Sequence, residues 1–273
     1  MRESAAMMAT IFGRKLKLAR PGLLVTGTDT GVGKTVITCA IAWNLRRGGI
    51  GRGRIGVCKP LATGCRRDRE GLVSPDAEAL AHFADCPQPL DIINPIRFKA
   101  PLAPGAAAAQ RSSHADDPVD YAALGRSLEL LDRTSDCVLV EGVGGILVPL
   151  DDADPLTTVL DLAEALDYPV LVVCRPGLGT LNHTAMTTTL LKQRGLRIAG
   201  LVINPMPTDP ARNEDPSIAL NREWLTRLTG VPVVATCPAC EAGIVAPEQG
   251  RLPEDVLEVM GQADWSGLLA RPR

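Results

Sequence analysis

The stretch from Leu23 to Arg47 constrains the fold more than any other part of the chain. A short apolar run, Leu23–Thr26, leads into the glycine-rich segment Gly27–Thr35, and Lys34–Arg47 follows with the apolar spacing of a helix. A loop between a buried strand and a helix N-terminus presents successive backbone N–H groups to phosphate oxygens. The stretch therefore predicts a nucleotide-binding α/β domain, with ATP as the expected nucleotide.

The spacing of this loop is one residue longer than the usual phosphate-loop pattern. GxxxxGK[ST] would place its first glycine at position 28, where the chain has Thr28, and the glycine is Gly27. We expect Lys34 to neutralise β- and γ-phosphate oxygens and Thr35 to place its hydroxyl on Mg²⁺. Gly33 lets the backbone approach the phosphates closely, where a Cβ would obstruct it.

Strand-length apolar runs and helical stretches alternate along the whole chain. The predicted strands cover residues 23–26, 54–59, 137–141, 169–174, 198–203 and 231–235. The predicted helices cover residues 34–47, 76–83, 121–131, 156–165, 181–193, 221–228 and 253–260, and 87–118 reads mainly as loop or short helix. The strands are continuous apolar runs, which indicates burial on both faces. We expect one α/β domain over residues 21–273, a P-loop NTPase-type parallel sheet with helices on both faces.

Composition excludes several other classes of function. The formal net charge is −2 and aromatic residues make up 3%, so neither a nucleic acid nor an anionic membrane is an expected partner. No apolar run approaches the roughly 20 residues of a membrane helix. Eight cysteines, several inside apolar runs, are typical of free thiols in a reducing cytoplasm, and Cys237–Cys240 reads as two incidental loop thiols. Residues 1–20 are basic and poor in acids; a transit peptide would have this composition, but we favour a flexible N-terminal extension.

Three further residues stand where a charged side chain is costly or unusual. Glu141 ends an apolar strand, so it either caps a local backbone N–H or organises a metal ion or water. Asp76 begins a short helix, where capping and metal binding are both open. Lys59 is the last residue of the second predicted strand. It is either a solvated lysine or a second cation near the phosphate loop.

The ordered motifs of the chain resemble those of the dethiobiotin synthetase family, over about Leu23 to Cys240. A phosphate loop alone is shared by many ATPases, but its Thr-Asp-Thr interior combined with the later motifs is more specific. The motifs are Val25-Thr-Gly-Thr-Asp-Thr-Gly-Val-Gly-Lys-Thr35, Lys59-Pro-Leu-Ala-Thr-Gly64, Ser74-Pro-Asp76, Val140-Glu-Gly-Val-Gly-Gly145, Gly177-Leu-Gly-Thr-Leu-Asn-His183 and Gly200-Leu-Val-Ile-Asn204.

The resemblance implies an ATP-dependent ring closure. Diaminopelargonate and carbon dioxide would form a carbamate, ATP would phosphorylate it, and the second amine would close the ureido ring of dethiobiotin, the penultimate step of biotin synthesis. Lys34 and Lys59 would be catalytic, and Thr35, Asp76 and Glu141 would surround Mg²⁺. The implied ATP-binding residues are Gly31, Val32, Gly33, Lys34, Thr35, Val36, Asp76, Glu141, Gly142, Val143, Gly144, Asn204, Pro205, Pro238, Ala239 and Cys240.

The same resemblance implies a homodimer whose substrate site lies at the subunit interface. Thr30 and Thr63 would contact the substrate from one subunit, and its carboxylate would be held by Gly179, Thr180, Leu181 and Asn182 of the other. A helix N-terminus suits that carboxylate because its free N–H groups carry partial positive charge.

The chain also departs from the family pattern. Some family members carry an acid where this chain has Gly31. A glutamate that often belongs to the adenine site, late in the family's sequences, has no firm counterpart here beyond Glu248. We interpret His183 as a polar residue at a helix start and not as a general base. An alternative is a nucleotide switch of the partition and septum-positioning kind, but the lysine typical of its loop is missing from Asp29–Gly33. A glutamine-dependent amidotransferase relative would need a further domain for which the chain has no room.

Overall fold

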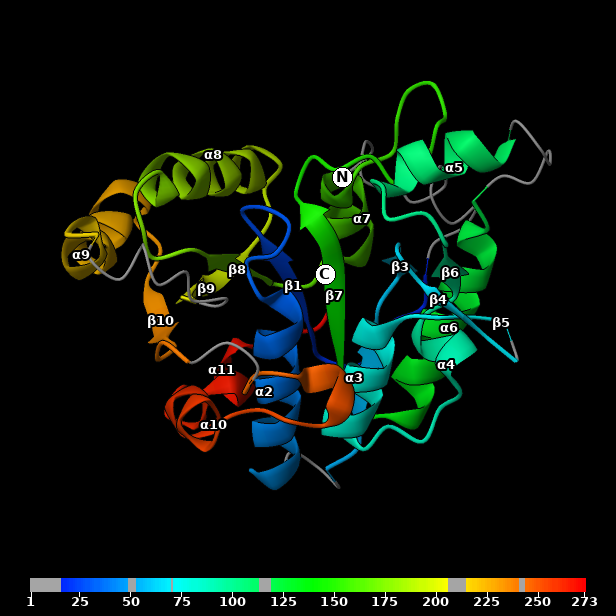
Figure 1. Ribbon diagram of the computed structural model, residues 1–273, viewed down its shortest axis with the longest axis horizontal. Helices are drawn as coiled ribbons and strands as arrows, with labels where there is room; N and C mark the ends of the chain where they lie inside the picture. The colour runs from blue at the N-terminus through cyan, green and yellow to red at the C-terminus, as the bar shows by residue number, and fades with distance from the viewer. Residues whose placement is uncertain (1–15, 49–52, 70, 113–118, 206–214, 241–243) are drawn as a thin grey trace.

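Six parallel strands form the central sheet of the computed structural model, in the order β10-β9-β8-β1-β7-β2 (Figure 1). The structure describes residues 16–48, 53–69, 71–112, 119–205, 215–240 and 244–273. The strands are β1 (Gly22–Gly27), β2 (Ile55–Cys58), β7 (Cys137–Gly145), β8 (Val170–Cys174), β9 (Ile198–Ile203) and β10 (Val233–Thr236). All neighbouring pairs run parallel, as the continuous apolar runs predict.

Helices cover both faces of this sheet, so the chain has two apolar layers. One layer packs Leu23 and Val25 of β1 against the first group of helices, and the other packs Leu24 of β1 against the second. The first group is α2 (Lys34–Arg47), α3 (Pro75–Ala84), α10 (Glu254–Gly261) and α11 (Trp265–Leu268). The second group is α5 (Pro104–Ser112), α6 (Tyr121–Thr134), α7 (Val159–Leu166), α8 (Thr180–Gln193) and α9 (Ser217–Thr229). The predicted fold class is confirmed.

Short elements lie beside the main sheet and escaped the sequence prediction. The segment expected to be loop or short helix also contains a strand that pairs in parallel with a strand after β2, and an antiparallel hairpin precedes α3. These elements are β3 (Leu61–Ala62), β4 (Arg66–Asp68), β5 (Gly71–Val73), β6 (Ile96–Arg97), α4 (Leu90–Ile93) and η2 (Pro247–Gln249). Strands of two or three residues are too short to show an apolar period.

Three predicted helix boundaries are wrong by three or four residues: α6 ends at Thr134 and not at 131, α9 begins at Ser217 and not at 221, and the start of α7 also differs. The sequence predicts a helix from residue 156, and α7 begins at Val159. Thr158 and Asp161 form a capping box, in which Thr158 N–H donates to the Asp161 carboxylate at 2.8 Å. The cap fixes the first turn of α7 after Thr158.

The two ends of the described chain pack on the domain. In the predicted extension, Leu16 is buried, and the N–H groups of Ala19 and Arg20 donate to Asp132 at 3.0 and 2.8 Å. Residues 16–20 are therefore anchored, and residues 1–15 lie outside the described residues. At the other end, Asn44 of α2 donates to Leu257 O at 3.0 Å, which attaches α10 to the helix that follows the phosphate loop.

Candidate active site

The phosphate loop joins β1, near the middle of the sheet, to α2. Gly33 is the N-cap of α2 with φ +86°, and Gly31 has φ +70°, a left-handed conformation that favours glycine at both positions. A Cβ on Gly27 would lie 2.6 Å from Val32 Cγ2, so the longer spacing still needs a glycine at its start. The loop geometry thus explains three of its glycines.

Lys34 is buried at the first turn of α2, where its ammonium donates to Asp29 O at 2.9 Å. Burial, together with the nearby charge of Lys59, lowers the pKa of Lys34 to about 8. Removing the ammonium from water makes its charge costly, so an anionic phosphate beside it would be stabilising.

Lys59, Glu141, Asp76 and Thr35 form one connected cluster beside the phosphate loop. Lys59 Nζ lies 2.5 Å from Glu141 Oε1 and 2.9 Å from Asp76 Oδ2. Thr35 Oγ1 lies 2.8 Å from Glu141 Oε1 and 3.1 Å from Asp76 Oδ1. The structure brings together the predicted metal-binding trio and the predicted catalytic lysine, although they come from four separate segments.

Strand register explains why these groups meet. Glu141 pairs with Val25 in the register of β7 and β1, and Gly145 pairs with Gly27 at the start of the phosphate loop. Lys59 directly follows β2, on the other side of β7. Ligands of open α/β sheets gather at the carboxyl ends of parallel strands. The predicted strand end at residue 141 is wrong, because β7 continues to Gly145, but Glu141 is level with the last residues of β1 and β2 and so faces that edge.

The charges of the cluster are mutually dependent. Burial acts to lower the pKa of Lys59, but the carboxylates of Glu141 and Asp76 outweigh it and raise that pKa well above the usual lysine value. The Lys59 ammonium lowers the pKa of Asp76, whereas complete burial raises the pKa of Glu141 against the attraction of Lys59. Lys59 thus favours the ionised form of both acids, and at Glu141 burial opposes it.

Asp76 reaches this cluster because another residue caps its helix. Ser74 is the N-cap of α3, and its side chain accepts a hydrogen bond from Ala77 N–H at 3.4 Å, with Pro75 at the first helical position. The two functions that the sequence leaves open for Asp76 are thereby separated. Its carboxylate contacts Lys59 and Thr35 and does not cap the helix.

The oxygen atoms of this cluster fit a hard divalent cation. Glu141 is fully buried, and its Oε2 has no hydrogen-bond partner among the residues that the structure describes. Such an atom is costly unless a cation or donor faces it. The described residues contain no group of three or more His, Cys, Asp or Glu placed for a metal ion, and the predicted set has only two carboxylates and a hydroxyl. That composition is typical of Mg²⁺, which keeps waters and phosphate oxygens as its other ligands.

The residues predicted to hold adenine lie after β9 and β10, on the other side of β1. Asn204 is buried, and its side-chain amide donates to Val32 O of the phosphate loop at 2.9 Å. Its Oδ1 is without a hydrogen-bond partner among the described residues. Asn204 thus ties the end of β9 to the phosphate loop and leaves one acceptor open. Pro205 follows it, and Pro238, Ala239 and the half-buried Cys240 follow β10.

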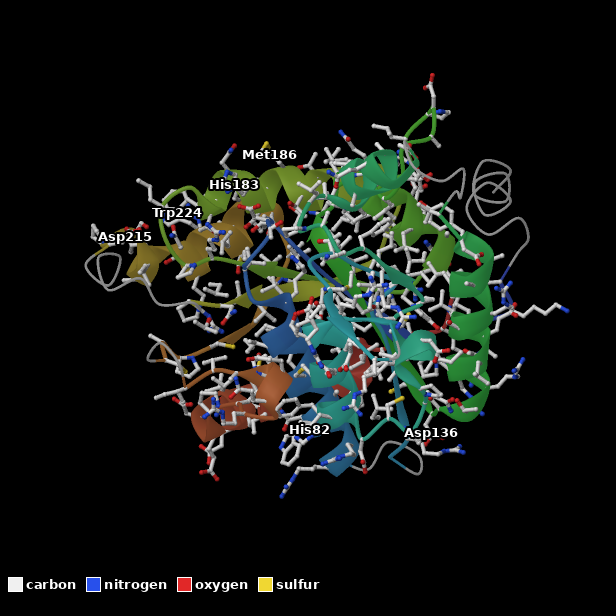
Figure 2. All side chains as sticks on the ribbon, turned by 45° about the vertical axis from the view of Figure 1, so that its right-hand side comes forward. His82, Asp136, His183, Met186, Asp215 and Trp224 are labelled. Carbon is white, nitrogen blue, oxygen red and sulfur yellow. The ribbon has the colours of Figure 1, made fainter. Side chains whose placement is uncertain are left out.

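The predicted substrate residues fall into two groups. Thr30 lies on the phosphate loop, and the half-buried Thr63 follows β3, four residues after Lys59. The second group stands at the start of α8, whose N-cap Gly179 has φ +91°. There Thr180 is buried and Asn182 is exposed, and Figure 2 shows His183 and Met186 further along α8 pointing away from the sheet.

Sequence reasoning missed Arg175, which directly follows β8. Its Nη2 donates to Thr30 O at 3.0 Å and lies 3.5 Å from Asp29 Oδ2, so it contacts the tip of the phosphate loop. The signal was available, because a charged residue at the carboxyl end of a buried strand is the pattern that singled out Glu141 and Lys59.

Comparison with known sequences gives consistent relatives. A family model described as an AAA domain matches residues 21–242. An "ATP-dependent dethiobiotin synthetase BioD" of Anaeromyxobacter sp. (strain K) is 43% identical over 220 residues, covering 80% of this chain and 89% of the relative. Proteins of the same name from Mycobacterium avium (42%, covering 83% and 90%) and Thermodesulfovibrio yellowstonii (36%, covering 80% and 89%) also match.

Comparison with solved structures supports the fold alone. A ParA family ATPase from Chlorobium tepidum has a TM-score of 0.53 at 12% identity, covering 89% of this chain and 98% of that chain. The MinC:MinD cell division complex of Aquifex aeolicus has a TM-score of 0.52 at 13% identity, covering 89% and 95%. The structural likeness indicates a shared α/β architecture, and because the identities are so low it says nothing about activity.

Proposed function

The chain belongs to the ATP-dependent dethiobiotin synthetase family, and we propose that it closes a ureido ring on diaminopelargonate with carbon dioxide and ATP. The observation that carries this proposal is the cluster of Lys59, Glu141, Asp76 and Thr35 beside the phosphate loop. A buried lysine held by two carboxylates next to a nucleotide site provides fixed positive charge where an anionic substrate and a phosphoryl group would meet.

The proposed reaction has three balanced steps. One amine of the diamine attacks carbon dioxide and loses a proton, which gives a carbamate. A carbamate oxygen attacks the γ-phosphorus of ATP and ADP leaves, which gives a carbamic-phosphoric mixed anhydride. The second amine attacks the carbamate carbon, the bond to the phosphate oxygen breaks, and phosphate and a proton are released with the ureido ring of dethiobiotin.

In this scheme the two lysines act on charge that develops during phosphoryl transfer. Lys34 would contact the β- and γ-phosphates, and Lys59 would face the carbamate and the transferring group. Removing a single well-placed charge or hydrogen-bond donor of this type typically costs about 10²- to 10³-fold in turnover. Lys59 acts here through its charge and not as a proton donor, because its raised pKa keeps it charged at neutral pH.

Mg²⁺ would be held by Thr35, Asp76 and Glu141, with phosphate oxygens completing its coordination. The unpartnered Glu141 Oε2 and the hard oxygen character of all three side chains support this assignment. When bound, the ion would offset the charge of the phosphates.

The nucleotide base would lie at Asn204, Pro205 and the segment Pro238–Cys240. The open Oδ1 acceptor of Asn204 suits the exocyclic amino group of adenine. Val32, Gly33 and Val36 continue the phosphate site, and Gly142, Val143 and Gly144 border it from β7.

The diamine would span two subunits of a homodimer. Thr30 and Thr63 would contact it near Lys59, and Gly179–Asn182 of a second subunit would hold its carboxylate at the start of α8. Exposed apolar residues on this side support an interface, because Leu178 is 90% and Met186 is 52% exposed.

The eight cysteines, none of them in a disulfide, fit the proposed cytoplasmic location. The described residues include no helix of the length and apolarity that a membrane span requires.

The test is phosphate release from ATP by the purified protein with bicarbonate and Mg²⁺. We expect release that depends on added diaminopelargonate, with one phosphate formed per diamine consumed. Release that is unaffected by the diamine would contradict the proposal. ATP-dependent binding to DNA or liposomes would favour a partition-type nucleotide switch instead.

A further inference from the structure

The loop between β8 and α8, residues 175–179, connects the phosphate loop to the proposed carboxylate site. We propose that Arg175 is a positioning residue that couples nucleotide binding at the phosphate loop to diamine binding at the start of α8. This inference rests on the proposed function, because it takes Gly179–Asn182 as the place where the substrate carboxylate binds.

One end of the connection is the tip of the phosphate loop. Arg175 donates to Thr30 O at 3.0 Å, and its guanidinium is 3.5 Å from the Asp29 carboxylate. Asp29 also accepts from Thr30 N–H through Oδ1 at 2.7 Å and from Lys34 Nζ through its carbonyl at 2.9 Å. Through these contacts, we expect a movement of Asp29 and Thr30 on phosphate binding to shift Arg175.

The other end is held by α9 and by Asp215, which lies two residues before α9. Leu178 N–H donates to Asp215 Oδ2 at 2.7 Å, and the buried side-chain amide of Asn221 donates to Pro176 O at 2.6 Å. Figure 2 places Asp215 on the α9 side of the molecule. The loop that begins at Arg175 is thus held on both sides, and α8 starts directly after it.

Only three residues separate Arg175 from Gly179, the N-cap of α8. So short a link, with Pro176 in it and hydrogen bonds to Asp215 and to Asn221 of α9, has few conformations of its own. The orientation of the first N–H groups of α8 should therefore depend on where Arg175 is held. These N–H groups are what the substrate carboxylate would bind.

The physical consequence is positive coupling between the two ligands. Phosphates on the loop fix Asp29 and Thr30, Arg175 is fixed with them, and the start of α8 is already ordered when the diamine arrives. A ligand that binds to an ordered site loses less conformational entropy and binds more tightly. The coupling is reciprocal, so the diamine must strengthen nucleotide binding by the same factor. In the proposed homodimer, it would link the nucleotide site of one subunit to the substrate site of the other.

The test compares diaminopelargonate affinity with and without a non-hydrolysable ATP analogue and Mg²⁺. For the wild-type protein we expect the analogue to tighten diamine binding about fivefold or more, at the low end of typical allosteric couplings. In Arg175→Gln the ratio should fall below about twofold. Arg194→Gln is the matched control, because Arg194 is the C-cap of α8, at the opposite end of the helix from Gly179. Its side chain is 42% exposed, against 43% for Arg175, and it forms an ion pair with Glu164 at 2.8 Å. Its ratio should equal the wild-type ratio.

The outcomes separate this inference from the proposed function. An active wild-type protein whose coupling ratio is unchanged in Arg175→Gln, or is close to one in the wild type, overturns the role of Arg175. A lowered kcat in Arg175→Gln with the wild-type ratio overturns it too, because that result assigns Arg175 to the reacting phosphoryl group. A wild-type protein without diamine-dependent phosphate release contradicts the proposed function itself.

Discussion

Replacing Lys59 tests the buried charge cluster in both stability and turnover. Lys59→Met keeps an unbranched side chain of similar length but removes the ammonium that lies 2.5 Å from Glu141 and 2.9 Å from Asp76. Breaking a buried ion pair by removing one partner typically costs about 3–5 kcal/mol, because the other charge stays buried. For a domain of this size, each kcal/mol corresponds to roughly 2–4 °C, so Tm should fall by about 6–20 °C.

A second substitution separates the two effects. In Lys59→Met/Glu141→Gln the buried carboxylate is also neutral, and neutral groups in place of a buried pair often restore most of the stability. We expect Tm to recover by more than half, while turnover stays at least about 10²- to 10³-fold below the wild type, because the fixed positive charge and a proposed Mg²⁺ ligand are both missing.

The assays are thermal and urea unfolding, together with diamine-dependent phosphate release. Lys192→Met serves as a control, since it removes a lysine that donates to Thr229 O, and should change stability by only about 1 kcal/mol. A double variant no more stable than Lys59→Met would refute the electrostatic reasoning. Turnover within about tenfold of the wild type in Lys59→Met would refute the proposed catalytic role.

Three further predictions concern the phosphate loop and its neighbours. Because the pKa of Lys34 is lowered to about 8, ATP affinity measured by calorimetry should weaken as pH rises from 7 to 9.5, by up to about tenfold per pH unit above 8, and a flat profile would contradict this. Thr35→Val removes the hydroxyl between Asp76 and Glu141 and should raise the Mg²⁺ concentration for half-maximal turnover at least about tenfold, whereas Thr226→Val on exposed α9 should leave it unchanged. Ser74→Ala removes the N-cap of α3 and should cost about 1 kcal/mol in urea unfolding; an unchanged midpoint would show that the cap contributes nothing.

The central fold could be predicted because its strands are buried on both faces. Continuous apolar runs such as 198–203 coincide with β9, and the helix expected at 34–47 coincides with α2. Elements that depend on tertiary contacts were missed. β6 has only two residues and exists because it pairs with β3, a contact that no local pattern shows.

In the candidate site, too, contiguous residues could be predicted from the sequence and long-range contacts could not. Gly33, Lys34 and Thr35 are contiguous, so a single motif predicts them. The choice between capping and cluster contact at Asp76 required knowing that Ser74 is the N-cap. The contact of Arg175 with Thr30 spans 145 positions and depends on β8 lying next to β1, which only the strand order reveals.

The measurement that tests the central claim most directly is oxygen transfer from labelled carbon dioxide to phosphate. If a carbamate oxygen attacks the γ-phosphorus, that oxygen leaves with the phosphate when the ring closes. A short incubation with C¹⁸O₂, diaminopelargonate, ATP and Mg²⁺ should therefore yield inorganic phosphate carrying one ¹⁸O atom, in amounts equal to the dethiobiotin formed. Dethiobiotin formed together with unlabelled phosphate, under conditions in which the carbon dioxide keeps its label, would contradict carbamate phosphorylation at this site.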